Sequence, residues 1–170
     1  MIKPKTKEYE NISLLTKEIR NTLNLKPKDI INIKELIKTL NGKITYNKKY
    51  IDCIEKTNNT FTLHIANKTS EKVDKIKKIK LLGFLYIGMG YNTHKNMWDM
   101  VNENVVFIPD IKQREYAECF TLQLLIPDDD FIYITKKYTK NNKIYAQHIA
   151  KHYDVPYYTI IDKLIMLGYE

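Results

Sequence analysis

Two histidines stand four residues apart near the C-terminal end of the sequence. His148 and His152 have the spacing that places side chains on one face of a helix. Two imidazoles at that spacing can bind one metal ion. No Glu follows the first histidine, and Ala146, Ile149 and Ala150 define the buried face. We therefore expect the two histidines at the surface, where any metal would be adventitious.

The other residues that could do chemistry are scattered along the chain. His64 follows Leu63 in an alternating pattern, which predicts an exposed position on a strand. The acidic run Asp128-Asp129-Asp130 lacks the spacing of a calcium-binding loop and favours the start of a helix. Cys53 and Cys119 form no CxxC motif, so we expect two free thiols in a reducing cytoplasm.

The first half of the chain is predicted to contain two helices, three strands and a long helix. Apolar spacing of three and four predicts helices over Glu10–Leu25 and from Asn32 to Leu40. We expect Asn32 to cap the second helix and Gly42 to end it in a left-handed conformation. The predicted strands are Lys43–Tyr46, Tyr50–Lys56 and Thr60–Ala66, the last two joined by a turn at Asn58-Asn59.

A helix capped by Ser70 is expected to run through a nearly continuous apolar stretch, Leu81–Ile87, before Gly88 and Gly90 end it. A polar loop over Tyr91–Glu103 follows in this prediction. The remaining expected elements are an extended piece at Val105–Ile108, a helix capped by Asp110 that runs to Leu125, a short element opened by Asp128, and two final helices over Lys143–Tyr153 and Tyr157–Leu167.

Charge is unevenly distributed along the chain. Residues 1–100 hold 20 Lys and Arg against 10 Asp and Glu, whereas residues 101–170 hold 8 against 10. A basic half can attract nucleic acid or an acidic protein. Solvated lysines are the competing explanation, because Lys, Asn, Ile and Tyr are frequent throughout. The most apolar stretch, Leu81–Met89, is about half of the roughly 20 residues that span a bilayer, so we expect no membrane association.

Four stretches in this order resemble the ImmA/IrrE-type metallopeptidase family, from about Ile12 to Tyr169. The stretches are Ile33–Ile44; the strand Phe61–Ile65 with the long helix that ends in Gly88-Met89-Gly90-Tyr91; Glu115–Pro127, similar to the family's Glu-Ala-Asn-x-Phe-Ala…Leu-Leu-Met-Pro helix; and Ile149–Gly168. The resemblance implies a zincin-like fold and a bacterial or phage setting. It also implies that active members cleave helix-turn-helix repressors.

The residues that would hold zinc in that family are replaced here. Alignment on Met89-Gly90-Tyr91 puts Lys80, Leu81 and Phe84 at the first His, the Glu and the second His of the His-Glu-x-x-His motif. Tyr116 stands at the third ligand, with Glu115 and Glu118 beside it. Lys, Leu and Phe offer zinc no lone pair. A charge pair of Lys80 with Glu115 or Glu118 could replace the charge of the metal; Lys80 reaching solvent is the alternative.

From these patterns we predict one α+β domain over residues 1–170, with a core over 10–127 and a helix-turn-helix-like pair over 143–168. A small, mostly antiparallel sheet should pack on the long central helix. We expect a catalytically inactive, cytoplasmic regulator without a cofactor, binding a protein partner such as a helix-turn-helix repressor. Two alternatives stay open: nucleic-acid binding through the basic half, and an enzyme that uses a different site.

Overall fold

The computed structural model describes residues 6–26, 29–47, 51–107 and 109–169. Within these residues the protein is a mixed α+β structure with eight α helices, one π helix, a four-stranded mixed sheet and a two-stranded hairpin. The chain divides into two compact units, which we call the sheet unit (residues 32–118) and the helical unit (residues 1–31 and 119–170). The single domain over 1–170 stays a prediction.

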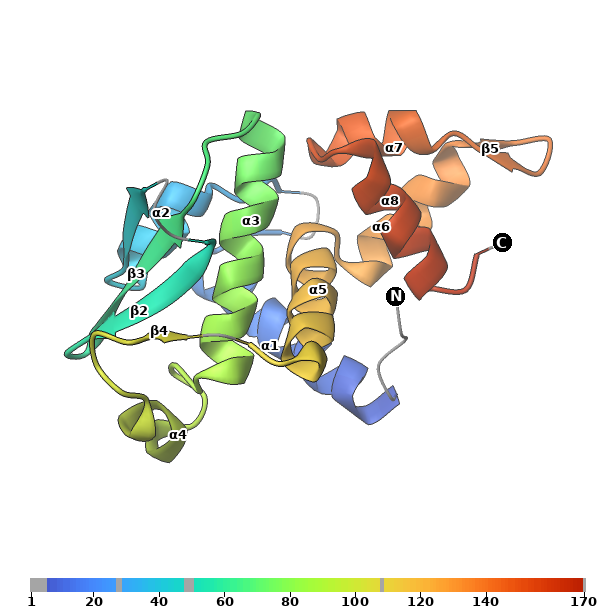
Figure 1. Ribbon diagram of the computed structural model, residues 1–170. Helices are drawn as coiled ribbons and strands as arrows, with labels where there is room; N and C mark the ends of the chain where they lie inside the picture. The colour runs from blue at the N-terminus through green and yellow to red at the C-terminus, as the bar shows by residue number, and fades with distance from the viewer. Residues whose placement is uncertain (1–5, 27–28, 48–50, 108, 170) are drawn as a thin grey trace. The chain divides into compact units, whose positions relative to one another are not determined.

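The sheet unit begins with α2 and is built around a small sheet and a long helix (Figure 1). Its elements are α2 (Ile33–Thr39), β1 (Lys43–Tyr46), β2 (Cys53–Thr57), β3 (Thr60–Ile65), α3 (Glu71–Gly83), the π helix η1 (Phe84–Gly88), α4 (Lys95–Met100), β4 (Val106–Phe107) and the first part of α5 (Ile111–Leu125).

The sheet has the order β1-β3-β2-β4, with β1 parallel to β3 and the other pairs antiparallel. This arrangement confirms the expected mostly antiparallel sheet of three or four strands. The register places Ile44 and Ile54 beside Leu63, and Phe107 beside Ile54, so these side chains share one apolar face. Figure 1 shows α3 running alongside the sheet.

Two turns in this unit rely on asparagine. Asn58 has φ of 54° in the hairpin between β2 and β3, as expected. At the end of α2 the left-handed residue is Asn41, with φ of 56°, and not Gly42, so that prediction is wrong. Gly42 is needed for another reason: a Cβ there would lie 2.3 Å from the ring of Phe61.

The long helix begins after Ser70 and its helical run ends at Gly88, as predicted, but two details differ. Ser70 precedes α3, but its side chain makes no capping hydrogen bond. After Gly83 the helix continues as a π helix to Gly88. Asn32, by contrast, caps α2 as predicted by accepting from the Glu35 amide, and Asp110 caps α5 by accepting from the Gln113 amide.

The predicted polar loop over Tyr91–Glu103 contains the helix α4, which sequence periodicity did not reveal. Trp98 is buried, and the Lys56 ammonium lies 4.9 Å from the centre of its ring. The same ammonium donates to the carbonyl oxygens of Trp98 and Val101, at 2.9 and 3.2 Å. These contacts to the C-terminal end of a six-residue helix come from a distant strand, and local sequence does not encode them.

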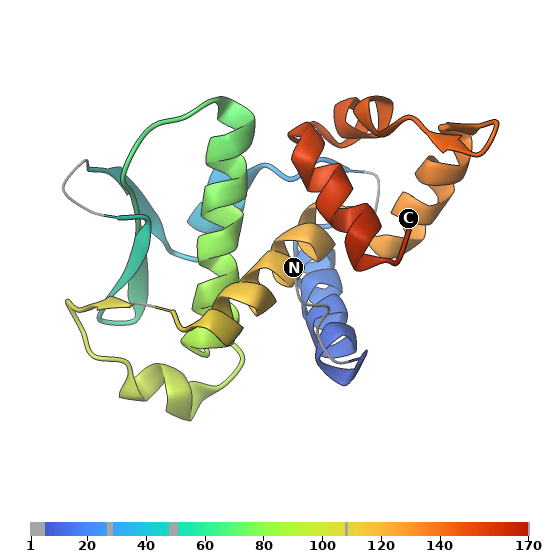
Figure 2. The same ribbon diagram turned by 45° about the vertical axis from the view of Figure 1, so that its right-hand side comes forward.

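The helical unit contains α1 (Thr6–Thr22), the end of α5, α6 (Asp128–Lys137), β5 (Thr139–Lys140), β6 (Lys143–Ile144), α7 (Ala146–Tyr153) and α8 (Tyr157–Met166). Figure 2 shows α7 and α8 joined by a tight connection. Asp154 begins it with φ of 51°.

Two predicted helices of this unit have other bounds in the structure. The first covers Thr6–Thr22 rather than Glu10–Leu25, and Lys143 and Ile144 form a strand rather than the start of a helix. They pair with Thr139 and Lys140 in an antiparallel hairpin. Its turn is Asn141-Asn142, and both residues have positive φ. A two-residue turn of this kind closes a hairpin, so the helix can begin only after it.

Arg20 connects the loop after α1 to the end of α5 through hydrogen bonds. Its side chain is buried and donates to the carbonyl oxygens of Leu124 and Asp29, at 2.8 Å each, and to that of Lys26. Burial lowers the pKa of Arg20, and the negative charges of Asp29 and Asp130 oppose that shift. One buried cation thus satisfies several carbonyl groups that would otherwise lack a partner.

Candidate functional site

The residues aligned with the zinc-binding motif lie on α3 and at the start of the π helix. Leu81 is 2% exposed and Phe84 is 7% exposed, so both belong to the buried interior. The Lys80 ammonium lies 2.6 Å from Oε1 of Glu118 on α5. Both side chains of this pair keep about a third or more of their surface in solvent, 34% for Lys80 and 41% for Glu118.

Helices α3 and α5 approach closely at this point. A Cβ on Gly83 would lie 2.9 Å from Cα of Ala117, which leaves no room for a side chain between the two backbones. Tyr116, the position aligned with the third ligand, is half-buried, and the Lys112 ammonium lies 5.6 Å from the centre of its ring. Glu115 is also half-buried, but the charge partner of Lys80 is Glu118.

These side chains do not fit the zinc ion that the family resemblance implies. Zinc in proteins takes imidazole nitrogen, thiolate or carboxylate ligands. Lys80 is engaged as a cation, and Leu81 and Phe84 have no lone pairs to offer. Across the residues that the structure describes, no three His, Cys, Asp or Glu side chains come together in a way that could hold a metal.

Both histidines of the C-terminal pair, His148 and His152, pack against aromatic rings. His148 is exposed and stacks on Tyr138, with ring centres 5.7 Å apart, while the ring of Tyr145 meets it edge-on. His152 is half-buried against Tyr153, and its Nε2 is shielded from solvent with no hydrogen-bond partner among the described residues. A buried Nε2 cannot share a surface metal with His148 unless the ring turns.

Much of the positive charge on α3 is neutralised within the sheet unit. Lys77 lies 3.3 Å from Asp52, and Lys78 forms an ion pair with Asp74. Lys78 is 3% exposed; its burial alone would lower the pKa, but hydrogen bonds with Asp74 and Tyr46 raise it overall. With Lys80 also paired, these three lysines on α3 give nucleic acid little unpaired charge to bind.

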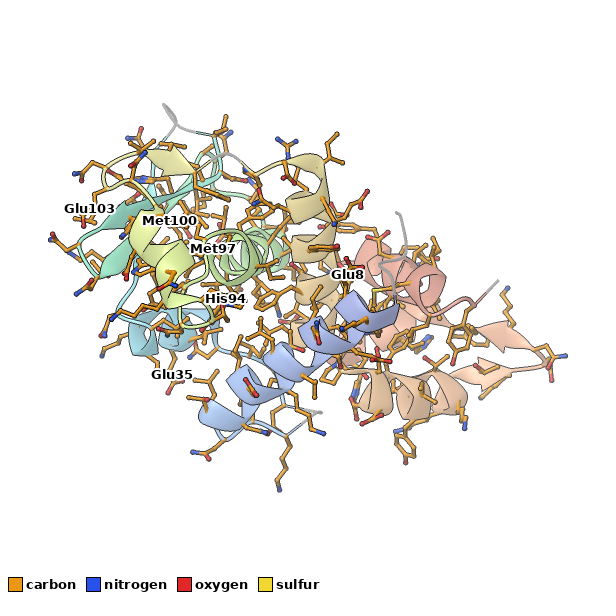
Figure 3. The ribbon with its side chains drawn as sticks, turned by 90° about the horizontal axis from the view of Figure 1, so that it is seen from below. Glu8, Glu35, His94, Met97, Met100 and Glu103 are labelled. Atoms are coloured by element: carbon orange, nitrogen blue, oxygen red, sulfur yellow. The ribbon has the colours of Figure 1, made fainter. Side chains whose placement is uncertain are left out.

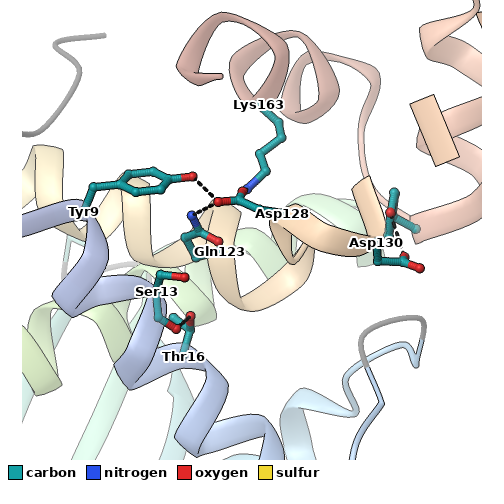
Figure 4. Close-up of polar contacts among 8 residues, drawn as sticks. Tyr9, Ser13, Thr16, Gln123, Asp128, Asp130 and Lys163 are labelled. Atoms are coloured by element: carbon teal, nitrogen blue, oxygen red, sulfur yellow. Dashed lines mark hydrogen bonds and ion pairs between the residues drawn. The ribbon is translucent and has the colours of Figure 1, made fainter. Parts of the chain in front are cut away.

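The sequence of the terminal helix pair allows a DNA-reading edge on α8 made of Tyr157, Tyr158, Thr159 and Lys163, with structural packing as the competing explanation. Tyr157 and Tyr158 are exposed as expected, but Thr159 is 2% exposed and Lys163 is fully buried. Lys163 points into the helical unit, where its ammonium lies 2.5 Å from Oδ1 of Asp128 (Figure 4). A lysine in that position cannot contact a phosphate, which takes away the one basic residue of that edge.

Asp128 is the centre of a buried polar cluster that the sequence did not reveal. Besides Lys163, it accepts hydrogen bonds from the Tyr9 hydroxyl at 2.6 Å and from the Gln123 amide at 2.9 Å. Burial by itself would raise the pKa of Asp128, but Lys163, Gln123 and Tyr9 together hold it below its usual value. Burial lowers the pKa of Lys163, and the charge of Asp128 opposes that shift.

His64 lies in a second cluster, and the prediction that it is exposed is wrong. It is 8% exposed, its Nδ1 lies 2.8 Å from the Thr45 hydroxyl, and its Nε2 lies 2.8 Å from Oε2 of Glu55. The register explains the cluster, because Thr45 lies opposite His64, and Glu55 is one diagonal step away, opposite Thr62. A sequence signal did exist for two of the three residues: Thr45 and His64 each stand between apolar residues of their strands, whereas Glu55 is followed by Lys56.

Several large apolar side chains of the sheet unit face solvent. Met100 and Ile111 are each 77% exposed, and Val105 is 53% exposed. Figure 3 shows Met97 and Met100 along α4, with Glu103 beyond its end. Exposed apolar side chains of this size are candidates for contact with a protein partner. Among the described residues, no helix has both the length and the apolar character to cross a membrane.

The comparisons with known proteins give no identification. The chain matches no family model, no curated protein and no solved structure. Its function is therefore argued from its own residues and from the family resemblance that they carry.

Proposed function

We propose that this chain is a divergent ImmA/IrrE-type metallopeptidase homologue that binds a protein without cleaving it. The observation that carries the proposal is the Lys80–Glu118 ion pair, which joins α3 to α5 where the resemblance places a zinc ion. A lysine ammonium supplies positive charge at that place but no coordination site for water. The resemblance also implies a zincin-like fold.

The replacements are consistent with one another. Buried Leu81 stands where a catalytic base would be, and a hydrocarbon side chain cannot accept a proton from water. Buried Phe84 replaces a ligand and adds apolar surface to the interior, which stabilises the fold by about 1.5–3 kcal/mol for a fully buried side chain. The same positions that would carry out hydrolysis thus contribute to stability.

The partner that fits this proposal is a helix-turn-helix repressor, because the resemblance implies that active members cleave such proteins. A chain that keeps the binding surface and lacks the metal would hold the repressor and sequester it from DNA. The exposed apolar side chains Met100, Val105 and Ile111 are consistent with a protein partner.

The site is tested by restoring it. A variant with Lys80→His, Leu81→Glu, Phe84→His and Tyr116→Glu should bind about one zinc ion per chain, whereas the wild-type protein should bind none at this place. Metal analysis of both proteins after dialysis is the measurement, and circular dichroism shows whether the variant is folded. A folded variant without zinc would mean that the alignment of α3 and α5 with the family is incorrect.

The activity is tested with a helix-turn-helix repressor encoded in the same genome. Size-exclusion chromatography should show a stoichiometric complex in which the repressor stays intact, with or without added zinc. Ile111→Asp and Met100→Asp test whether the exposed apolar residues take part, and Leu14→Asp, at another exposed apolar position, is the matched control. Zinc-dependent cleavage of the repressor by the wild-type protein, stopped by a chelator, would overturn the proposal.

A further inference from the structure

Three side chains on adjacent strands of the sheet unit form a hydroxyl–imidazole–carboxylate row. Thr45 on β1, His64 on β3 and Glu55 on β2 lie in this order, with two contacts of 2.8 Å. The three residues share the face of the sheet opposite the apolar one, as their register requires. We call this group the Thr45–His64–Glu55 row.

The chemistry of the partners fixes the proton on the ring. An ionised carboxylate can only accept, so the Nε2 that faces Glu55 carries the hydrogen. In the neutral imidazole the lone pair is then on Nδ1, which faces the Thr45 hydroxyl. That hydroxyl donates to Nδ1. A base aligned on a hydroxyl and oriented by a third group is the arrangement that activates a nucleophile.

Solvent exposure decreases from the hydroxyl of the row to its imidazole and carboxylate, as a nucleophile with a buried base requires. Thr45 is exposed, so a small molecule in solvent can reach its oxygen. His64 is 8% exposed and Glu55 is 27% exposed at its side chain, so the base and the group that orients it are held within the sheet. Thr62 lies on the same face, opposite both Glu55 and Lys43, and is half-buried, which makes it a natural control hydroxyl.

We propose that Thr45 is a nucleophile that takes acyl groups from small activated esters or thioesters, with His64 as its base and Glu55 as the positioning residue. Oγ1 of Thr45 attacks the carbonyl carbon while its proton passes to Nδ1 of His64. The bond from that carbon to the leaving oxygen or sulfur breaks, and the leaving group receives the proton. Water, deprotonated by Nδ1, then hydrolyses the threonine ester and restores the hydroxyl.

This inference goes beyond the proposed function and is independent of it, because the row lies on the sheet and shares no residue with α3 or α5. The test uses p-nitrophenyl acetate and the full chain. Release of p-nitrophenolate and acetylation of Thr45, mapped by peptide mass spectrometry, are the two readouts. We expect Thr45→Val to abolish the acetylated peptide and His64→Gln to slow its formation by about a hundredfold or more.

Three further variants keep the test decisive. Thr45→Ser should retain acetylation because it keeps the hydroxyl, and Thr62→Val should leave it unchanged. Glu55→Gln should slow it and alter its dependence on pH, because an amide does not stabilise the imidazolium as a carboxylate does. Acetylation of Thr45 at an equal rate in wild type and in His64→Gln, or no preference for Thr45 over Thr62, would overturn the proposal.

Discussion

In each unit of the protein a lysine–carboxylate pair joins two helices, and these two pairs differ in their surroundings. In the sheet unit, Lys80 and Glu118 meet at 2.6 Å with 34% and 41% of their side chains exposed. In the helical unit, Lys163 is fully buried and meets Asp128 at 2.5 Å, with Tyr9 and Gln123 also bound to the carboxylate. The N–O distances of the two pairs are nearly the same, but the exposure of their side chains to solvent differs.

The comparison shows which charge pair stabilises the fold and which one can be substituted with little effect on stability. Water screens the Lys80–Glu118 pair, so it contributes little to stability and its residues can vary while the fold is kept. The Lys163–Asp128 pair has lost most of its hydration, with side chains that are 0% and 24% exposed, and removing one partner would leave the other without its countercharge. The Lys80–Glu118 pair is thus the weaker one.

The largest effect is expected from Lys163→Met. It removes the ammonium but keeps a long apolar side chain, and should lower the free energy of unfolding by about 3 kcal/mol, the low end for a buried pair, because Asp128, whose side chain is 24% exposed, then loses its charge partner. Urea unfolding followed by circular dichroism is the measurement. The double variant with Asp128→Asn should recover part of the loss; a loss below about 1 kcal/mol for the single variant would mean that the pair is not buried in solution.

A smaller loss is expected from Tyr9→Phe, which removes one hydrogen bond to the Asp128 carboxylate and leaves Lys163 in place. Hydrogen bonds to charged groups contribute about 1.5–3 kcal/mol, so unfolding in urea should shift by that amount. Tyr133→Phe, at a tyrosine that is 68% exposed, is the matched control and should have no effect. Equal effects of the two substitutions would mean that the hydrogen bond from Tyr9 to Asp128 does not stabilise the fold.

Lowering the pH should reduce the free energy of unfolding in part, because the contribution of the Lys163–Asp128 pair is lost when Asp128 is protonated. The pKa of Asp128 in the folded protein lies below its usual value, so its contribution is complete above the unfolded pKa of about 3.9 and is lost as pH falls through the lower, folded pKa. Carbon-13 NMR of the Asp128 carboxyl group should show a midpoint below that of an exposed aspartate. A midpoint at or above the usual value would contradict the assigned cluster.

The smallest effect is expected from Lys80→Met. An exposed ion pair contributes roughly 0–1 kcal/mol, and added salt reduces that further. Urea unfolding of Lys80→Met and of Glu118→Gln should therefore lie within about 1 kcal/mol of the wild type. A loss as large as that of Lys163→Met would show that the two pairs contribute equally to stability and would contradict this prediction.

Most elements were predictable because their signals are local. Asn32 and Asp110 cap helices that carry apolar stripes, and Asn58 marks the hairpin turn. Two predictions failed because of distant residues: Lys56 on β2 binds the end of α4, and the ring of Phe61 occupies the space beside Gly42. The failure at Lys143 was local, because the Asn141-Asn142 turn precedes it directly. The candidate site on α3 was placed by family resemblance, but its charge partner, Glu118 rather than Glu115, required the structure.

The sequence by itself determined the class of the fold, most helix and strand positions and the side chains that cannot bind zinc, because periodicity, capping and ligand chemistry are properties of single residues and their near neighbours. Only the tertiary structure decided that Lys163 is buried on Asp128 and that Thr45, His64 and Glu55 form a row. Strand register and helix packing set these contacts between residues far apart in the chain, and no local pattern records them.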